Sequence, residues 1–159
     1  MNQIEQNFLP LLDMGMDVLA MALENVSASD LEFTPPGDNA GLGELCRAMG
    51  DIAFAYAQSF RTKSMDFSIT ADDRRSPRNG GELSEWIRAQ EGLIKEAVRR
   101  YSDEELTTNH VDRGGGWKVP LLTQFHIYRE ALLIFFGKLD VYLRMMRKPR
   151  PQTWVQWVG

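Results

Sequence analysis

Apolar residues recur every three or four positions along four segments of the chain, and this spacing predicts four amphipathic helices. The segments cover approximately residues 2–26, 40–63, 80–101 and 119–146. No segment shows the sustained alternation of apolar and polar residues that marks a half-buried strand. The pattern therefore predicts an all-α fold, a four-helix bundle with long loops, in which residues 1–159 form a single domain.

Residues near the ends and along the faces of these helices add detail. Pro10 is expected either to kink the first helix or to mark the start of its regular part, because proline removes an intrahelical hydrogen bond. Asn79, with Glu82 three residues later, predicts a capping box at the start of the third helix. Glu91 and Lys95 are expected to pair on the solvent-facing side of that helix.

Composition and charge narrow the classes of function. The chain has 159 residues, of which 43% are hydrophobic. A core of this size can stabilise the fold without a bound metal or a disulfide bond. Its single cysteine, Cys46, excludes an intrachain disulfide and suits a reducing cytosol. The formal net charge of −4 provides no general attraction for nucleic acid. No apolar run approaches the roughly 20 residues that span a bilayer, and Glu5 and Asp13 stand where a signal peptide needs basic and then apolar residues. We therefore expect a cytoplasmic protein with neither a membrane nor a nucleic acid as partner.

Two remaining segments are rich in glycine or in aromatic residues. Residues 114–116 are all glycine, lack the lysine of a phosphate-binding loop, and predict a flexible hinge before the fourth helix. The C-terminal tail mixes cations and tryptophans, namely Arg144, Arg147, Lys148, Arg150, Trp154 and Trp157. Such a mixture can hold nucleic acid, but cations also favour helix C-termini. We expect an aromatic tail that folds back onto the bundle or onto a partner.

Two stretches carry a resemblance to a known family. Leu42-Gly43-Glu44-Leu45 follows a Pro/Gly-rich loop, and Gln-Phe-His-Ile-Tyr-Arg-Glu occupies positions 124–130; these segments resemble the second and fourth helices of the DinB/YfiT-like family. The resemblance implies a four-helix bundle that is often dimeric. It also implies, for active members, a divalent metal held by three histidines, with activity as thiol-dependent transferases or isomerases, or as metal-dependent hydrolases.

The positions that the resemblance assigns to the three metal ligands hold Ala48, Gln124 and Tyr128, none of which is histidine. A catalytic zinc or nickel site needs about three nitrogen, oxygen or sulfur donors. Ala48 has no donor, Gln124 is a weak neutral ligand, and Tyr128 would have to lose its proton. We therefore expect no metal and no other cofactor, with zinc or nickel as the alternative. Gln124 and Tyr128 still share a helix face, because four residues turn a helix by only about 40° net.

Other candidate residues have a functional and a structural interpretation. Glu44 and Asp51 lie seven residues apart and are expected near Ala48. In the functional interpretation, the two carboxylates act as acid and base or bind a cationic ligand. In the structural interpretation, they pair with Arg or Lys side chains or face solvent. His126 is expected at the surface beside Glu130, with a metal site shared across a dimer as the alternative. His110 is expected to be a loop residue, and Cys46 an inert one.

The leading hypothesis is a metal-independent protein that binds an unknown small molecule in a pocket near Ala48, Gln124, Tyr128, Glu44 and Asp51. The first alternative is a thiol-dependent transferase or hydrolase that uses Tyr128, Glu44 or Asp51, so whether the protein is an enzyme stays open. The second alternative is a structural or interaction module. A homodimer is expected in either case, because Ile127, Ile134 and Val141 form an apolar ridge outside the core stripe of the fourth helix.

Overall fold

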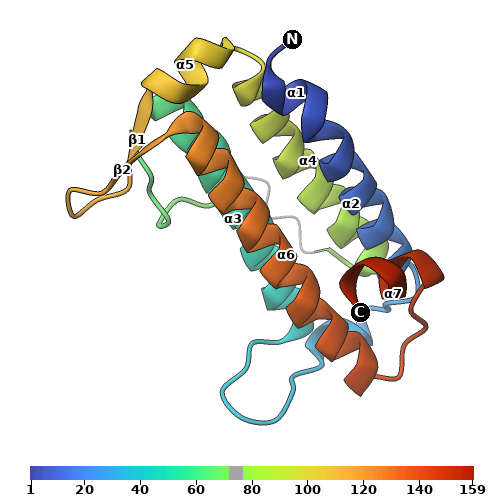
Figure 1. Ribbon diagram of the computed structural model, residues 1–159. Helices are drawn as coiled ribbons and strands as arrows, with labels where there is room; N and C mark the ends of the chain where they lie inside the picture. The colour runs from blue at the N-terminus through green and yellow to red at the C-terminus, as the bar shows by residue number, and fades with distance from the viewer. Residues whose placement is uncertain (72–76) are drawn as a thin grey trace.

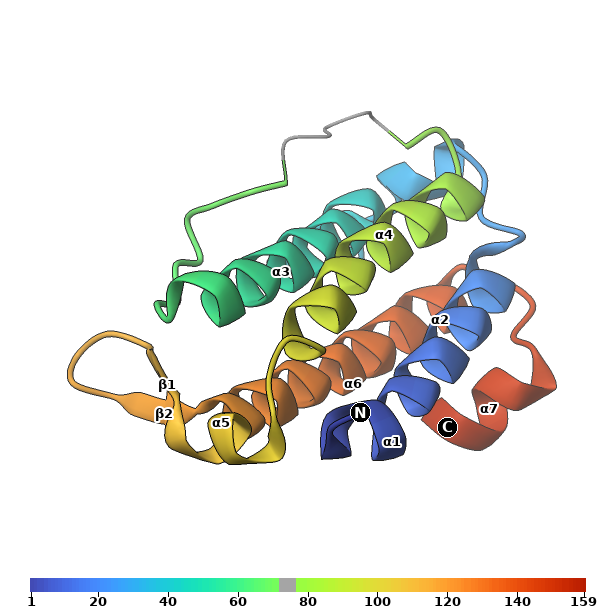
Figure 2. The same ribbon diagram turned by 90° about the horizontal axis from the view of Figure 1, so that it is seen from above.

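The computed structural model describes residues 1–71 and 77–159. Within them, the four longest helices are α2 (Leu9–Leu23), α3 (Leu42–Thr62), α4 (Gly80–Val98) and α6 (Leu121–Met145). They lie side by side as a bundle, with α3 and α4 in one layer and α2 and α6 in the other (Figures 1 and 2). The prediction of an all-α bundle is confirmed.

Shorter elements close the ends of the bundle. The helices among them are α1 (Gln3–Asn7), the 3-10 helix η1 (Ser29–Glu32), α5 (Asp103–Thr108) and α7 (Gln152–Val158). Two strands, β1 (His110–Asp112) and β2 (Lys118–Pro120), form an antiparallel hairpin with Val111 opposite Val119. Three residues per strand are too few for alternation to stand out in the sequence, so the hairpin was not predicted.

The four long helices do not simply alternate in direction. Gly50 of α3 lies against Trp86 of α4, and Arg61 pairs with Glu96 at 3.8 Å further along both helices, so α3 and α4 run parallel. The backbone N–H of Gly80 donates to the carbonyl of Val26 at 2.8 Å, which joins the end of α2 to the start of α4. A parallel pair needs a connection as long as the helices themselves, which is why a long segment separates α3 from α4.

The helix starts follow the local sequence, with one difference. The backbone breaks at Phe8, and Pro10 lies in the first turn of α2, so proline marks the start of this helix. At the start of α4 the Asn79 side chain accepts the Glu82 N–H at 3.0 Å. The Glu82 carboxylate, however, accepts the Arg78 N–H at 2.7 Å. Only half of the predicted capping box therefore forms.

The glycines at 114–116 form the turn of the β1–β2 hairpin. Their φ angles are +87°, +60° and +83°, in the left-handed region that side chains other than glycine disfavour. The expectation of a hinge gives way to a defined turn, because the Trp117 N–H donates to the Gly114 carbonyl at 3.0 Å and the Arg113 N–H to the Trp117 carbonyl at 2.8 Å.

The C-terminal tail folds back onto the bundle as α7 (Figure 1). Trp154 is fully buried, and its ring N–H donates to Asp140 of α6 at 2.9 Å. Asp140 also receives Arg144 at 2.6 Å and Arg150 at 2.9 Å. Arg144 at the end of α6 and Arg150 of the tail thus neutralise a carboxylate of the bundle. Trp157 stays 40% exposed, so the tail buries one of its two tryptophans fully.

None of the helices in the described ranges is long and apolar enough to cross a membrane.

Candidate functional site

The inward face of α6 carries Gln124 and Tyr128, both fully buried. Each meets a partner from α3, which runs antiparallel to α6. The Gln124 side-chain N–H donates to the hydroxyl of Ser59 at 2.9 Å. One turn further on, the rings of Tyr128 and Tyr56 pack with their centres 5.4 Å apart. The structure therefore brings together two of the predicted site residues, and it adds Ser59 and Tyr56 to them.

A cation from the hairpin completes the surroundings of Gln124. Nη1 of Arg113 donates to the Gln124 side-chain oxygen at 2.6 Å, and it lies 3.5 Å from the Tyr56 hydroxyl. The hairpin is held in place from the end of α3, because the Asp112 N–H donates to the Lys63 carbonyl at 2.9 Å and the Met65 N–H donates to the Asp112 carbonyl at 2.8 Å. Sequence reasoning missed Arg113; its only signal was a cation directly before the three glycines.

On its other side, Tyr128 faces α4. Its hydroxyl oxygen is buried without a hydrogen-bond partner, and so are both carboxylate oxygens of Glu91, which is fully buried. Burial raises the pKa of Tyr128 well above its usual value, and the nearby Glu91 raises it further, because an anion there disfavours the phenolate. Tyr128 therefore stays protonated at neutral pH.

Glu91 is the least expected member of this cluster. Burial raises its pKa to about 7, although the Lys95 ammonium, 3.4 Å from one carboxylate oxygen, acts in the opposite direction. Lys95 in turn contacts Asp13 of α2. The expectation that Glu91 and Lys95 pair on the solvent side is wrong, because both are buried. Their i,i+4 spacing fits an inward pair equally well, and Glu91 lies four residues after Ile87 and three before Ile94, on the apolar face that α4 turns to the core.

The remaining predicted site residues lie elsewhere. Ala48 is exposed on α3, eight residues before Tyr56, which corresponds to about 12 Å along the helix axis. Glu44 lines a separate surface hollow of about 450 Å³ with Leu31 and Arg78, and its carboxylate accepts the Gly41 N–H at 3.1 Å. Because α3 runs antiparallel to α6, the first turns of the two helices lie at opposite ends of the bundle. The expected meeting of Ala48 with Gln124 and Tyr128 is therefore corrected.

Asp51 is half-buried, and its carboxylate accepts the backbone N–H of Ala71 at 3.0 Å. This bond fastens the segment that follows α3 to the middle of that helix. Asp51 thus has a backbone partner, which differs from both structural roles expected for it, pairing with a cation and facing solvent.

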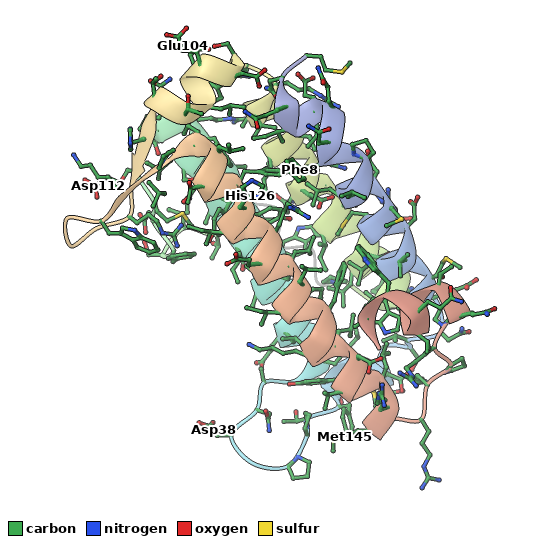
Figure 3. The ribbon with its side chains drawn as sticks, viewed as in Figure 1. Phe8, Asp38, Glu104, Asp112, His126 and Met145 are labelled. Atoms are coloured by element: carbon green, nitrogen blue, oxygen red, sulfur yellow. The ribbon has the colours of Figure 1, made fainter. Side chains whose placement is uncertain are left out.

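The histidines and the cysteine stand outside the Gln124–Tyr128 cluster. His126 lies edge-on to Phe8 with ring centres 5.0 Å apart, in the space between α6 and the start of α2 (Figure 3). Burial, and then the neighbouring Arg129, lower its pKa. His110 is exposed, with Nδ1 2.8 Å from the Thr108 carbonyl. Cys46 is fully buried, and burial raises its pKa to about 12, which disfavours the reactive thiolate.

The arrangement of the helices matches a known fold. The crystal structure of YjoA, a DinB-like protein from Bacillus subtilis, superposes on this chain with a TM-score of 0.72. This chain has the DinB-like fold. The match covers 94% of this chain and 96% of YjoA at 18% sequence identity. No family model and no curated protein matches the sequence.

The side chains at the centre of this DinB-like bundle do not fit a divalent metal. The Gln124 oxygen already accepts from a guanidinium, and a metal ion beside that cation would be repelled. The Tyr128 phenol keeps its proton, because burial raises its pKa. Among the described residues, no group of three or more His, Cys, Asp or Glu side chains is placed to hold a metal ion. What the cluster offers instead is hydrogen bonding from an amide, two phenols and one guanidinium, beside the buried carboxyl of Glu91.

Proposed function

We propose that the protein binds a small molecule without a bound metal, at a site formed by Gln124, Tyr128, Tyr56 and Arg113. The observation that carries the proposal is the Arg113 guanidinium on the Gln124 oxygen, at a position where the family resemblance assigns a metal ligand. A fixed organic cation there supplies the positive charge that a metal would supply. The surrounding tyrosines add apolar area and hydroxyl groups, a combination typical of ligand sites.

The unpaired hydroxyl of Tyr128 supports the same proposal. A buried polar group without a partner costs about 1–3 kcal/mol. A ligand that offers a hydrogen-bonding group to Tyr128 or Glu91 would recover part of this energy. We expect the ligand to reach the cluster from the hairpin side, where Arg113 is half-buried. We also expect the protein to act in the cytoplasm.

Two measurements test the proposal. Elemental analysis of untagged protein, grown with added zinc, nickel and manganese, is expected to find far less than one metal ion per chain. A melting-temperature screen of a small-molecule library is expected to yield compounds that stabilise the protein, because a ligand stabilises the state to which it binds. Their effect should shrink in Tyr128→Phe and in Gln124→Leu, and should persist in His110→Gln, a change at an exposed residue. Metal at one ion per chain, or hits that are insensitive to both site variants, would overturn the proposal.

A second proposal concerns association of two copies through α6. Leu133, Ile134, Val141 and Met145 of this helix are between 47% and 59% exposed, and exposed apolar residues gathered on one helix are typical of an interface. Ile127, the third residue of the expected ridge, packs against the core instead. Sedimentation velocity is expected to show a dimer that Ile134→Glu or Val141→Glu dissociates. Arg100→Glu, a change at an exposed residue just past the end of α4, serves as the control for added negative charge.

A further inference from the structure

The hydrogen bonds of Arg113 use only one corner of its guanidinium. Nη1 donates to Gln124 and lies near the Tyr56 hydroxyl, whereas Nε is buried with no hydrogen-bond partner. Across the described part of the chain, no carboxylate forms an ion pair with this side chain. The adjacent Asp112 accepts the Gly114 N–H at 2.8 Å and lies 3.9 Å from Lys118. A half-buried positive charge without an anionic partner is costly for a folded protein.

The edge that remains is the one formed by Nε and Nη2. These two N–H groups point in the same direction, and their spacing matches the two oxygens of a carboxylate. Gln124 holds Nη1, and the hairpin holds the backbone of Arg113. The orientation of this edge is therefore set before any ligand arrives, which lowers the entropic cost of binding.

Aromatic rings flank the same guanidinium. Its central carbon lies 4.7 Å from the ring centre of Trp117, 5.7 Å from that of Tyr56 and 5.8 Å from that of Phe67. Trp117 is 54% exposed and Phe67 59% exposed, unusual values for such large apolar side chains. They come from the β1–β2 hairpin and from the segment after α3, so two separate parts of the chain bring them to one cation.

We infer that the Arg113 edge and the Trp117 and Phe67 rings bind a small carboxylate with an aromatic body. The carboxylate accepts from Nε and Nη2, and the body packs on the two exposed rings, which move aside to admit it. This inference rests on the proposed function, because Gln124 belongs to both sites, and it specifies the chemical class of the ligand.

The test compares three probes, which are phenylacetate, its neutral analogue phenylacetamide, and acetate. Binding is followed by titration calorimetry and by the NMR signal of the Arg113 Nε–H group. We expect phenylacetate to bind, to bind more tightly than either other probe, and to shift that signal downfield. Arg113→Gln should weaken phenylacetate binding about tenfold or more, as expected for loss of a charge-assisted pair. Lys118→Gln, which removes an exposed cation of the same hairpin, should leave it unchanged.

Two further variants separate recognition from folding. Trp117→Ala and Phe67→Ala alter exposed side chains, so the protein should stay folded, while phenylacetate binding weakens toward that of acetate. Equal binding of phenylacetate and phenylacetamide, unaltered by Arg113→Gln, would overturn the inference and leave the proposed function intact. Absence of phenylacetate binding at millimolar concentration would also overturn it. The proposed function fails separately, when the broad ligand screen yields no compound whose effect depends on Gln124 or Tyr128.

Discussion

Replacing Glu91 with glutamine should make the protein more stable at pH 8 and leave its stability nearly unchanged at pH 5. Glu91 is fully buried, and burial raises its pKa from 4.5 to about 7. The folded state therefore holds this proton more tightly than the unfolded state does. The stability that the protonated carboxyl contributes is fully present below about pH 4.5, and it is lost as the pH rises through 7.

The size of the effect follows from that shift. Each pKa unit corresponds to about 1.4 kcal/mol, so a shift from 4.5 to about 7 corresponds to about 3 kcal/mol between the two ends of the titration. Besides burial, three charges act on Glu91, and the Tyr128 hydroxyl lies beside it. Lys95 and Arg88 favour the carboxylate, and Asp13 disfavours it. Glutamine has nearly the same shape and carries no charge to bury.

Urea unfolding followed by circular dichroism, at four pH values between 5 and 8.5, measures the effect. The quantity of interest is the difference in unfolding free energy between Glu91→Gln and the parent protein, which is expected to rise by about 3 kcal/mol across this range. Glu96→Gln is the matched control, because Glu96 lies on the same helix with 61% of its side chain exposed. Its difference from the parent is expected to be small at every pH.

If the difference in unfolding free energy between Glu91→Gln and the parent does not change with pH, the reasoning is refuted. The Glu91 carboxyl would then have the same pKa in the folded and unfolded states. A difference that falls with pH would reverse the sign of the assigned shift. Titration of the Glu91 side-chain carbon signal by NMR provides an independent check. Its midpoint should lie near pH 7, well above the usual 4.5 of a glutamate.

Three further outcomes are expected. Gly80→Ala should destabilise the protein by about 1–3 kcal/mol, because an added Cβ would lie 2.2 Å from the Leu23 carbonyl oxygen. The control is Gly92→Ala in the same helix, where an added Cβ meets nothing within 4 Å. In thermal unfolding, this control should be as stable as the parent protein or more stable. Asp140→Ala should release α7, since it leaves the buried Trp154 ring N–H and two arginines without their acceptor; limited proteolysis should then remove the tail faster than in the parent protein. Cys46 should react with iodoacetamide only after unfolding, and equal rates with and without urea would contradict its burial.

Local sequence predicted one side of the site, on α6, but not the residues that face it from α3. The sequence predicted that Gln124 and Tyr128 share a helix face, because that face is fixed by helical spacing alone. It could not predict which residues of α3 lie opposite, because that depends on the direction in which α3 and α6 run. Ala48 was therefore assigned to a site that Tyr56 and Ser59 occupy in the structure.

Arg113 and Glu91 were missed for related reasons. Arg113 reaches Gln124 only because a hairpin, anchored to Lys63 and Met65, turns its side chain toward the bundle. Glu91 was placed at the surface because charged residues are rarely buried. The i,i+4 pairing with Lys95 does not report which face turns inward, whereas the position of Glu91 between Ile87 and Ile94 on the apolar face does.

The sequence by itself determined the four long helices, most of their boundaries, the all-α bundle and the resemblance to the DinB-like fold. These follow from apolar spacing and from turn-forming residues, which act over a few positions. Tertiary structure alone decided the parallel course of α3 and α4, the docking of Trp154 on Asp140, and the neighbours of Tyr128 and Gln124. Those features depend on contacts between residues far apart in the chain, whose energies are settled only when all the helices pack together.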